Sequence, residues 1–386
     1  MTLPDFFLSP DFPSPTRIVF GMGRIAALGA AARELSASRA LVVSDPGIVA
    51  AGHSQRGMDS LNAAGLETRL FDGVEENPTT EHVQAGLAVA KQFQPELIVG
   101  LGGGSSMDCA KGVNFLYSCG GRMQDYWGVE KATGPLLPMI AVPTTAGTGS
   151  ETQSFALIAD AQSHVKMACG DRRAAFRVAI LDPELTLTQP PRVAALTGFD
   201  ALSHAVETFV SKKRSNTSCR ISREAWKRLA PNYLRVLREP DNIDARAQMQ
   251  LGACLAGLAI EHSMLGAAHA LANPLTAEFG VSHGEAVALM LPHVVRRNGR
   301  QCDPWYRELL SSTDFSQCPS GGSESLADFL SNLASEAGLA ARLKDCGIPR
   351  GRLAELAQSA AQQWTGAFNP VDLTAEDFLW LYEQAF

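Results

Sequence analysis

Long hydrophobic runs, closely spaced cysteines and an excess of basic residues are all missing from this chain of 386 residues. Its eight cysteines include no Cys-x-x-Cys pair, which excludes a zinc ribbon and fits reduced thiols in a cytoplasmic protein. There are 33 basic and 40 acidic residues, and the formal charge of −7 argues against a nucleic-acid partner, which would need a basic face. The charged fraction of 19% and the hydrophobic fraction of 46% exclude a disordered chain and predict a substantial core in two domains.

Neither a membrane span nor a secretory signal is expected. The most apolar long segment, residues 251–275, is interrupted by one glutamate and two histidines, and we interpret it as a buried helix. Residues 1–14 contain two aspartates and three prolines and lack the charged and apolar regions of a signal peptide. We therefore expect no membrane partner.

The first half of the chain alternates short apolar runs with helical stretches. Residues 25–36 and 80–93 have helical spacing, and residues 154–159 and 164–169 are predicted to form a hairpin. The predicted strands are 16–20, 40–44, 96–101, 138–142 and 178–181. Strands and helices that alternate in this way indicate a parallel sheet covered by helices.

The second half contains almost no strand-like runs. Long segments with a period of 3.6 residues predict helices over 192–210, 222–237, 245–271, 284–297 and 326–338. Residues 312–324 are predicted to form a loop. The prediction is therefore an α/β domain over residues 1–188 and an all-α domain over residues 189–386.

Four residues of the second half form a set that suits a metal ion. Asp200 and His204 are four residues apart, so they share one face of a predicted helix. His269 is expected near the end of the next helix, and His283 begins another one. One carboxylate and three imidazoles suit a divalent first-row metal with an open position. The spacing alone also fits an ion pair on a helix surface and a core histidine.

A glycine-rich loop follows one of the predicted strands. Gly102, Gly103, Gly104 and Ser105 precede a helix that carries Asp108. The glycines allow close approach of a ligand, and the free N–H groups at a helix start attract phosphate. The loop departs from the Rossmann fingerprint in two ways. Counted from Gly100, its sixth position is Ser105 rather than glycine or alanine, and it follows a middle strand rather than the first. A tight structural turn explains the same residues.

Two further features suit a nucleotide. Thr144, Thr145 and Thr148 belong to a loop of small hydroxyl residues that follows a strand and could line a phosphate or ribose. Asp45 ends the predicted strand 40–44, where a carboxylate can accept hydrogen bonds from ribose hydroxyls and repel a 2′-phosphate, which favours NAD over NADP. A turn-forming aspartate is the alternative.

These motifs resemble those of the iron-containing (group III) alcohol dehydrogenase family from about residue 15 to the C-terminus. The resemblance is carried by Gly-Gly-Gly-Ser-Ser-Met-Asp at 102–108, by Pro-Thr-Thr-Ala-Gly-Thr-Gly-Ser-Glu at 143–151, by the Asp200–His204 pair, and by His269 with His283. It implies a dehydroquinate synthase-like architecture, with a dinucleotide-binding domain and a helical metal-binding domain.

The resemblance also implies the roles of individual residues. The metal ligands it implies are Asp200, His204, His269 and His283, and the implied cofactor contacts are Asp45, Gly102, Gly103, Gly104, Ser105, Asp108, Thr144, Thr145, Thr148 and Lys166. The implied activity is hydride transfer between a nicotinamide cofactor and a primary alcohol or its aldehyde. Iron(II) is expected from the family, although zinc accepts the same ligands. A homodimer is expected on the general frequency of dimers.

One position departs from the family pattern. Many members have a second histidine four residues after the third ligand, where this chain has Asn273. An amide does not titrate near neutral pH, so we expect Asn273 to position water or contact the substrate. Related activities remain alternatives: a glycerol dehydrogenase, a maleylacetate reductase, or a lyase of the dehydroquinate synthase type. A binding protein without catalytic activity is a further alternative.

Overall fold

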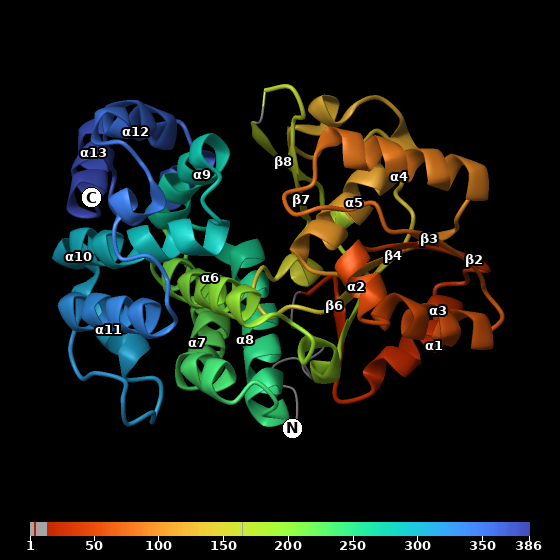
Figure 1. Cartoon of the computed structure of the whole chain (residues 1–386), viewed down its shortest axis with the longest axis horizontal. Helices are drawn as coiled ribbons and strands as arrows, with labels where there is room; N and C mark the ends of the chain where they lie inside the picture. Colours follow the sequence, from red (N-terminus) through yellow and green to blue (C-terminus); the bar gives the residue numbers. More distant parts are fainter. Residues whose placement is uncertain (1–3, 5–13, 164) are drawn as a thin grey trace. The chain divides into compact units, whose positions relative to one another are not determined.

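The computed structural model describes residue 4, residues 14–163 and residues 165–386. The chain divides into two compact units, which Figure 1 colours along the sequence. The α/β unit contains the described residues up to Thr145 and Gly149–Gln189; the helical unit contains Ala146–Thr148 and Pro190–Phe386. The first unit is thus interrupted by three residues of the threonine loop, which pack with the second.

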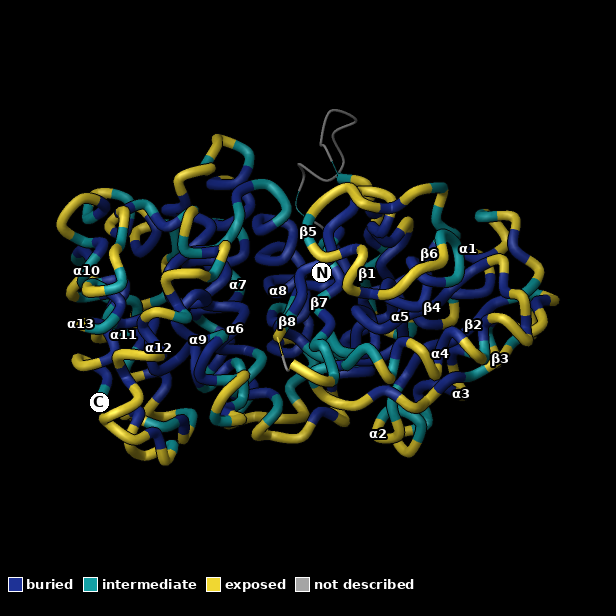
Figure 2. Tube along the Cα trace, turned by 90° about the horizontal axis from the view of Figure 1, so that it is seen from above, coloured by how far each residue is buried: buried dark blue, intermediate teal, exposed yellow. Residues whose placement is uncertain are grey.

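A six-stranded parallel sheet forms the centre of the α/β unit, in the order β1-β9-β6-β4-β2-β3. Its strands are β1 (Arg17–Phe20), β2 (Arg39–Val43), β3 (Glu67–Phe71), β4 (Leu97–Gly102), β6 (Met139–Pro143) and β9 (Val178–Leu181). The helices are α1 (Leu28–Glu34), α2 (Pro46–Ala50), α3 (His53–Ala63), α4 (Thr80–Phe93) and α5 (Gly104–Cys119). Every residue of β4 and β6 is buried, as parallel strands covered on both faces require (Figure 2). The five strands predicted for this sheet are confirmed, and β3 was not predicted.

The hairpin is also present in the described residues. Strands β7 (Phe155–Ala159) and β8 (Lys166–Gly170) pair antiparallel, and β5 (Gly128–Val129) adds to β8 to form a three-stranded sheet. Residue 164, where the second strand was predicted to begin, lies outside the described residues. The prediction for residues 1–14 also falls almost entirely outside them.

A buried ion pair joins α5 to the segments that follow β6. The Nζ atom of Lys111, which is fully buried, donates hydrogen bonds to Ser150 O at 2.9 Å, Ser150 Oγ at 2.8 Å and Phe155 O at 2.7 Å. Asp108, one turn earlier on α5, lies 3.6 Å from the same Nζ atom and accepts hydrogen bonds from Ser150 Oγ and Leu157 N. These contacts tie the end of the threonine loop and the start of β7 to one helix.

The helical unit contains helices as its only regular elements in the described part of the chain. They are α6 (Pro191–Val210), α7 (Asn216–Arg238), α8 (Ile243–Ser263), α9 (Ala267–Phe279), α10 (His283–Leu310), α11 (Ser323–Glu336), α12 (Leu353–Ala361) and α13 (Ala375–Gln384). Helix α6 is held by its fully buried Phe199 and Phe209, each contributing about 1.5–3 kcal/mol of hydrophobic stabilisation. Tyr233 of α7 packs edge-on against Phe199 and donates a hydrogen bond to Ala195 O, fixing the rotation of α6.

The predicted single helix over residues 245–271 is wrong. The structure has two helices, α8 and α9, and the second is bent by 107° from the direction of the first. Met264 has a positive φ of 68°, and Gly266 precedes α9. Both helices are buried on nearly all sides, so their sequence shows no change of periodicity at the break. His269 therefore lies in the first turn of α9, and its predicted place near the end of a helix is wrong.

No single helix in the described ranges is long and apolar enough to span a membrane, and α8 and α9 reach such a composition only when they are taken together across their bend.

A histidine of α10 predicts how acid affects stability. Burial and the neighbouring charge of Arg296 lower the pKa of His293 to about 4 from an ordinary value of 6.5. In the unfolded chain this imidazole is protonated below about pH 6.5, whereas in the folded chain it is protonated only below about pH 4. The free energy of unfolding therefore decreases as the pH falls from about 6.5 to about 4. We expect His293→Gln to flatten this decrease, measured as urea unfolding midpoints between pH 7 and pH 4.5. Parallel pH profiles for the variant and the wild type would contradict the prediction.

Candidate functional site

One carboxylate oxygen of the helical unit is surrounded by imidazole nitrogens. Asp200 Oδ1 lies 3.3 Å from His204 Nε2, 3.5 Å from His269 Nε2 and 3.8 Å from His283 Nε2. Asp200 and His204 share one face of α6, as their spacing predicted, while His269 comes from the first turn of α9 and His283 begins α10. Three helices thus bring four predicted residues together.

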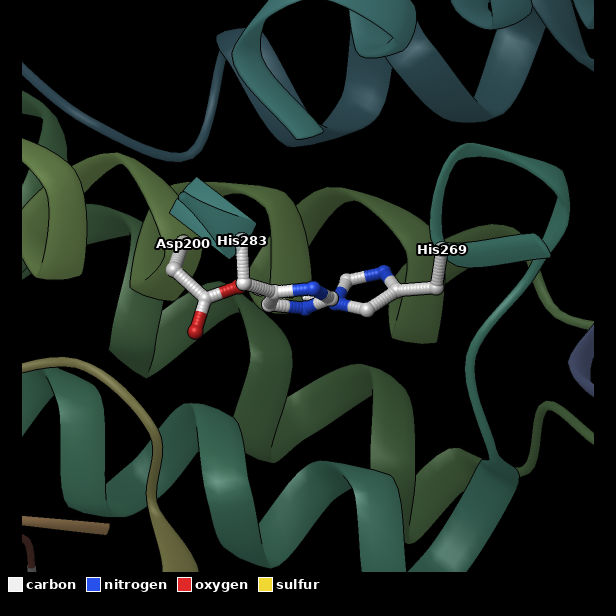
Figure 3. Close-up of side chains that lie close together, drawn as sticks. All are labelled: Asp200, His269 and His283. Carbon is white, nitrogen blue, oxygen red and sulfur yellow. Dashed lines mark ion pairs between the residues drawn. The ribbon is translucent and has the colours of Figure 1, made fainter. Parts of the chain in front are cut away.

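Three of the four residues form the tighter group. Asp200, His269 and His283 each offer a ligand atom, and these atoms lie within 4.8 Å of one another. Figure 3 shows their side chains pointing toward one another. His204 lies beside this group, with its ring stacked on that of His269 at a centroid distance of 5.0 Å.

The donor atoms of this group fit a metal ion. Asp200 Oδ1 and His269 Nε2 are buried and make no hydrogen bond, although they lie 3.5 Å apart. His269 Nδ1 is occupied by a carboxylate, so in the neutral ring Nε2 carries a lone pair that faces the carboxylate oxygen. Two buried acceptors that face each other are stabilised by a cation between them.

The electrostatics of the group point the same way. Burial alone would raise the pKa of Asp200, but the surrounding imidazoles, His204 first, hold that pKa well below its ordinary value. Burial would likewise lower the pKa of His269, but the charges and hydrogen bonds of Glu207 and Asp200 together outweigh it and raise the pKa to about 9. The two carboxylates thus hold a positive charge on the ring of His269 between them, and a bound metal ion would take the place of the proton on Nε2.

Glu207 is a residue that sequence reasoning missed. It is buried on α6, and its Oε2 atom lies 2.6 Å from His269 Nδ1. The available signal was its position, seven residues after Asp200 and therefore on the same helix face. Its partner, however, is 62 residues away and reaches it only because of the bend between α8 and α9.

Asn273 lies on α9 one turn after His269. Its Nδ2 atom donates a hydrogen bond to Gln363 Oε1 at 3.0 Å. Gln363 was not predicted, and it places a second amide beside the first. Neither side chain titrates near neutral pH, so this position offers hydrogen bonds without proton transfer.

The second group of predicted residues lies at the carboxyl ends of neighbouring strands in the α/β unit. Strands β2, β4 and β6 are adjacent and parallel, and they end at Asp45, at the glycine loop and at Thr144. The strand order also changes direction between β2 and β4, because β3 follows on one side and β6 on the other. In open α/β sheets, such a switch point is where ligands bind.

The backbone at this edge leaves room for a ligand. Gly102 has φ of 151°, and a Cβ atom there would lie 2.5 Å from Ser106 Oγ, so the position requires glycine. Gly103 precedes the sixteen-residue helix α5 without a side-chain cap, and a Cβ atom there would meet nothing closer than 3.5 Å. Gly104 and Ser105 form the first turn of α5, whose N–H groups and dipole favour an anion.

Asp45 and Thr144 lie beside this loop. The carboxylate of Asp45 accepts a hydrogen bond from Ile48 N, which caps α2, and another from Ser106 Oγ at 3.1 Å. Thr144 N donates to Gly102 O at 3.0 Å, and the buried Thr144 Oγ1 has no hydrogen-bond partner. Asp45 therefore also has the turn-forming role considered as an alternative, and Thr144 has an unused hydroxyl at the same edge.

The remaining predicted cofactor residues do not lie in the glycine loop or at the end of β2. Asp108 is buried by its contacts with Lys111 and Ser150, which account for it without a cofactor. Lys166 begins β8, opposite Ala159 of β7. Thr145 is the last residue of the α/β unit before the interruption, and Thr148 belongs to the helical unit.

Comparisons with known proteins agree over nearly the whole chain. Residues 15–183 match the model of the iron-containing alcohol dehydrogenase family, and residues 194–386 match that of the C-terminal part of the Fe-containing alcohol dehydrogenase family. Alcohol dehydrogenase 4 of Schizosaccharomyces pombe (strain 972) is 34% identical over 97% of this chain and 88% of its own length.

Solved structures show the same relationship. A 1,3-propanediol oxidoreductase has 31% identity and a TM-score of 0.92, covering 97% of this chain and 99% of its own. Sulfoacetaldehyde reductase from Bifidobacterium kashiwanohense, in complex with NAD+, has 28% identity and a TM-score of 0.86, covering 97% and 98%. The α/β and all-α fold class is thereby confirmed. The chain belongs to the iron-containing alcohol dehydrogenase family and is an oxidoreductase that acts on alcohols.

Proposed function

We propose that this protein interconverts a primary alcohol and its aldehyde by hydride transfer to or from NAD, with a divalent metal ion at Asp200. The observation that carries the proposal is the convergence of three imidazole nitrogens on one buried carboxylate oxygen, at 3.3, 3.5 and 3.8 Å. A carboxylate with three histidines, supplied by three helices, is a donor set for a first-row metal.

The proposed ligands are Asp200, His204, His269 and His283. A divalent ion held by them supplies Lewis acidity to the oxygen of the alcohol or aldehyde. The chain's own contribution is to hold the donor atoms on buried, well-packed helices, so that little reorganisation accompanies the reaction. Iron(II) is the proposed ion, as in the family's name, and zinc suits the same ligands.

The proposed cofactor site is the switch point of the sheet. Phosphate groups would lie on the first turn of α5 at Gly103, Gly104 and Ser105, where the helix has no side-chain cap. The hydroxyl of Thr144, and those of Thr145 and Thr148 in the same loop, supply further donors. Gly102, Asp108 and Lys166 complete the proposed set. Asp108 would act indirectly, because its hydrogen bond from Ser150 Oγ holds the end of the threonine loop in place.

Asp45 supports NAD over NADP. It ends β2 next to the glycine loop, where a carboxylate accepts hydrogen bonds from ribose hydroxyls and repels a 2′-phosphate. The NAD+ bound in the sulfoacetaldehyde reductase neighbour supports the same choice.

Asn273 bears on the proton that alcohol oxidation releases. Because an amide cannot take up this proton near neutral pH, we propose that it leaves through water or the cofactor's ribose hydroxyls, while Asn273 contacts the substrate. The proposed substrates are small primary alcohols and aldehydes, in line with the alcohol and 1,3-propanediol named for the neighbours.

The proposal also covers the location, the oligomeric state and the roles of the two domains. Eight free cysteines support a reducing, cytoplasmic location. A homodimer is proposed on the general frequency of dimers. The α/β unit is proposed as the cofactor-binding domain, residues 1–188, and the helical unit as the metal-binding domain, residues 189–386.

An anaerobic assay tests the proposal. The purified protein is stripped of metal, reloaded with iron(II) or zinc, and followed at the absorbance of NADH with a panel of short alcohols and aldehydes, with NADP+ in parallel. We expect turnover only after reloading and a higher kcat/KM with NAD+ than with NADP+. Full activity in the stripped protein would overturn the metal role, and a preference for NADP+ would overturn the role of Asp45.

A further inference from the structure

The buried carboxylate of Glu207 has no part in the ligand set, yet it contacts one of the ligands. It accepts hydrogen bonds from Ala268 N on Oε1 at 2.7 Å and from Gly266 N on Oε2 at 3.1 Å. The same Oε2 atom lies 2.6 Å from His269 Nδ1. One carboxylate therefore engages two backbone amides and one imidazole within four consecutive residues.

These contacts replace a cap that α9 does not have. Gly266, the residue before the helix, provides no side-chain hydrogen bond, and the first turn contains no acidic residue. The first N–H groups of a helix need acceptors, and a negative charge beside them is favourable. Glu207 supplies both from α6, and so fixes the helix start that carries His269.

The backbone is shaped to admit the carboxylate. A Cβ atom at Gly266 would lie 3.0 Å from Glu207 Oε1 and 3.2 Å from Asn369 Oδ1, so a side chain there would displace one of them. Met264, two residues earlier, has a φ of 68° at the point where the chain turns between the two helices. The bend between α8 and α9 thus places His269 beside Glu207 of α6, which is 62 residues earlier in the sequence.

We propose that Glu207 is a positioning residue for the metal ion: it holds the proton of His269 on Nδ1, orients the ring, and leaves Nε2 as the ligand atom facing Asp200. This inference rests on the proposed metal site. A carboxylate that accepts the second N–H of a metal-binding histidine fixes its tautomer and increases its strength as a ligand, and losing such a partner weakens metal binding about 10- to 100-fold.

The test is the metal affinity of the apoprotein, measured with zinc in competition with a chromophoric chelator. Glu207→Gln preserves shape and one acceptor oxygen but removes the charge, so we expect affinity to fall by about 10-fold, and by about 100-fold in Glu207→Ala. The loss is larger in Glu207→Ala because glutamine keeps one oxygen that can accept the N–H of His269, whereas alanine keeps none. Activity of Glu207→Gln should recover when excess metal is added.

Asn369→Ala is the matched control. Asn369 is buried like Glu207, and its Oδ1 atom accepts a hydrogen bond from Ala267 N in the same turn, but its hydrogen bonds go to Ala267, Asn298 and Val371 rather than to His269. We expect this variant to lower the melting temperature and to keep the wild-type metal affinity. Equal weakening in Asn369→Ala and Glu207→Gln would show that the turn alone matters and would overturn the positioning role.

The design separates this inference from the proposed function. If the wild-type protein binds zinc and Glu207→Gln binds it equally well, the role of Glu207 is refuted while the metal site stands. If the wild-type protein itself binds no divalent ion, the proposed function fails first. Where Glu207→Ala does not fold, Glu207→Gln decides, because its side chain occupies the same volume.

Discussion

Asp200→Ala is expected to lose bound metal and to lower kcat/KM for alcohol oxidation by about 10²- to 10³-fold, the scale found when a group that stabilises developing charge is removed. Asp200 supplies the oxygen on which the nitrogens of His204, His269 and His283 converge, so its removal leaves the imidazoles without their common anionic partner. Metal content after dialysis and kcat/KM with reloaded protein measure the two losses.

Asp200→Asn sharpens this test because it keeps the shape and removes the charge. Glu285→Gln is the control: Glu285 lies in the first turn of α10, two residues after His283, and pairs with Arg192 rather than with an imidazole. We expect Glu285→Gln to retain metal and activity. An Asp200→Ala protein that still turns over alcohol at the wild-type rate would refute the metal role altogether.

Lys111→Met is expected to lower the free energy of unfolding by about 3–5 kcal/mol, because it leaves a buried carboxylate without its cation. Burial raises the pKa of Asp108, and Lys111 is the main charge that opposes the increase. Without Lys111, the folded protein would bind a proton at Asp108 at a pH where the unfolded chain does not, so the deficit should grow as the pH rises above about 4. Urea unfolding followed by circular dichroism at pH 4.5 and pH 7.5 measures it.

The double variant Lys111→Met with Asp108→Asn separates the charge from the packing. With both ionic groups gone, no unpaired charge is buried, and we expect much of the lost stability to return. A single variant within about 0.5 kcal/mol of the wild type, the range of ordinary surface substitutions, would contradict the prediction.

The sheet was predictable where its strands are buried on both faces. Strands β4 and β6 read as short continuous apolar runs because every residue in them is covered. Strand β3 was missed because it lies at an edge of the sheet and is made of Glu67–Phe71, in which charged residues alternate with others and only the last one is buried. Its pairing with β2 supplies the stability that its composition lacks.

The candidate site was predictable as far as local spacing reaches. Asp200 and His204 share a helix face at a separation of four, which sequence alone reveals. Glu207 lies on the same face, but its contact with His269 depends on the bend after α8, and two helices that are buried on nearly all sides give no sequence signal of that bend.

The short interruption of the α/β unit has a consequence for dissecting the protein into fragments. A Cβ atom at Gly147 would lie 2.4 Å from Thr197 Cβ, so the tip of the threonine loop fits tightly against α6 one turn before Asp200. A recombinant piece that starts at Pro190 would lack Ala146–Thr148 and expose this part of α6 to water. A fragment cut at residue 190 is therefore not the complete helical unit, because it lacks three residues that belong to that unit.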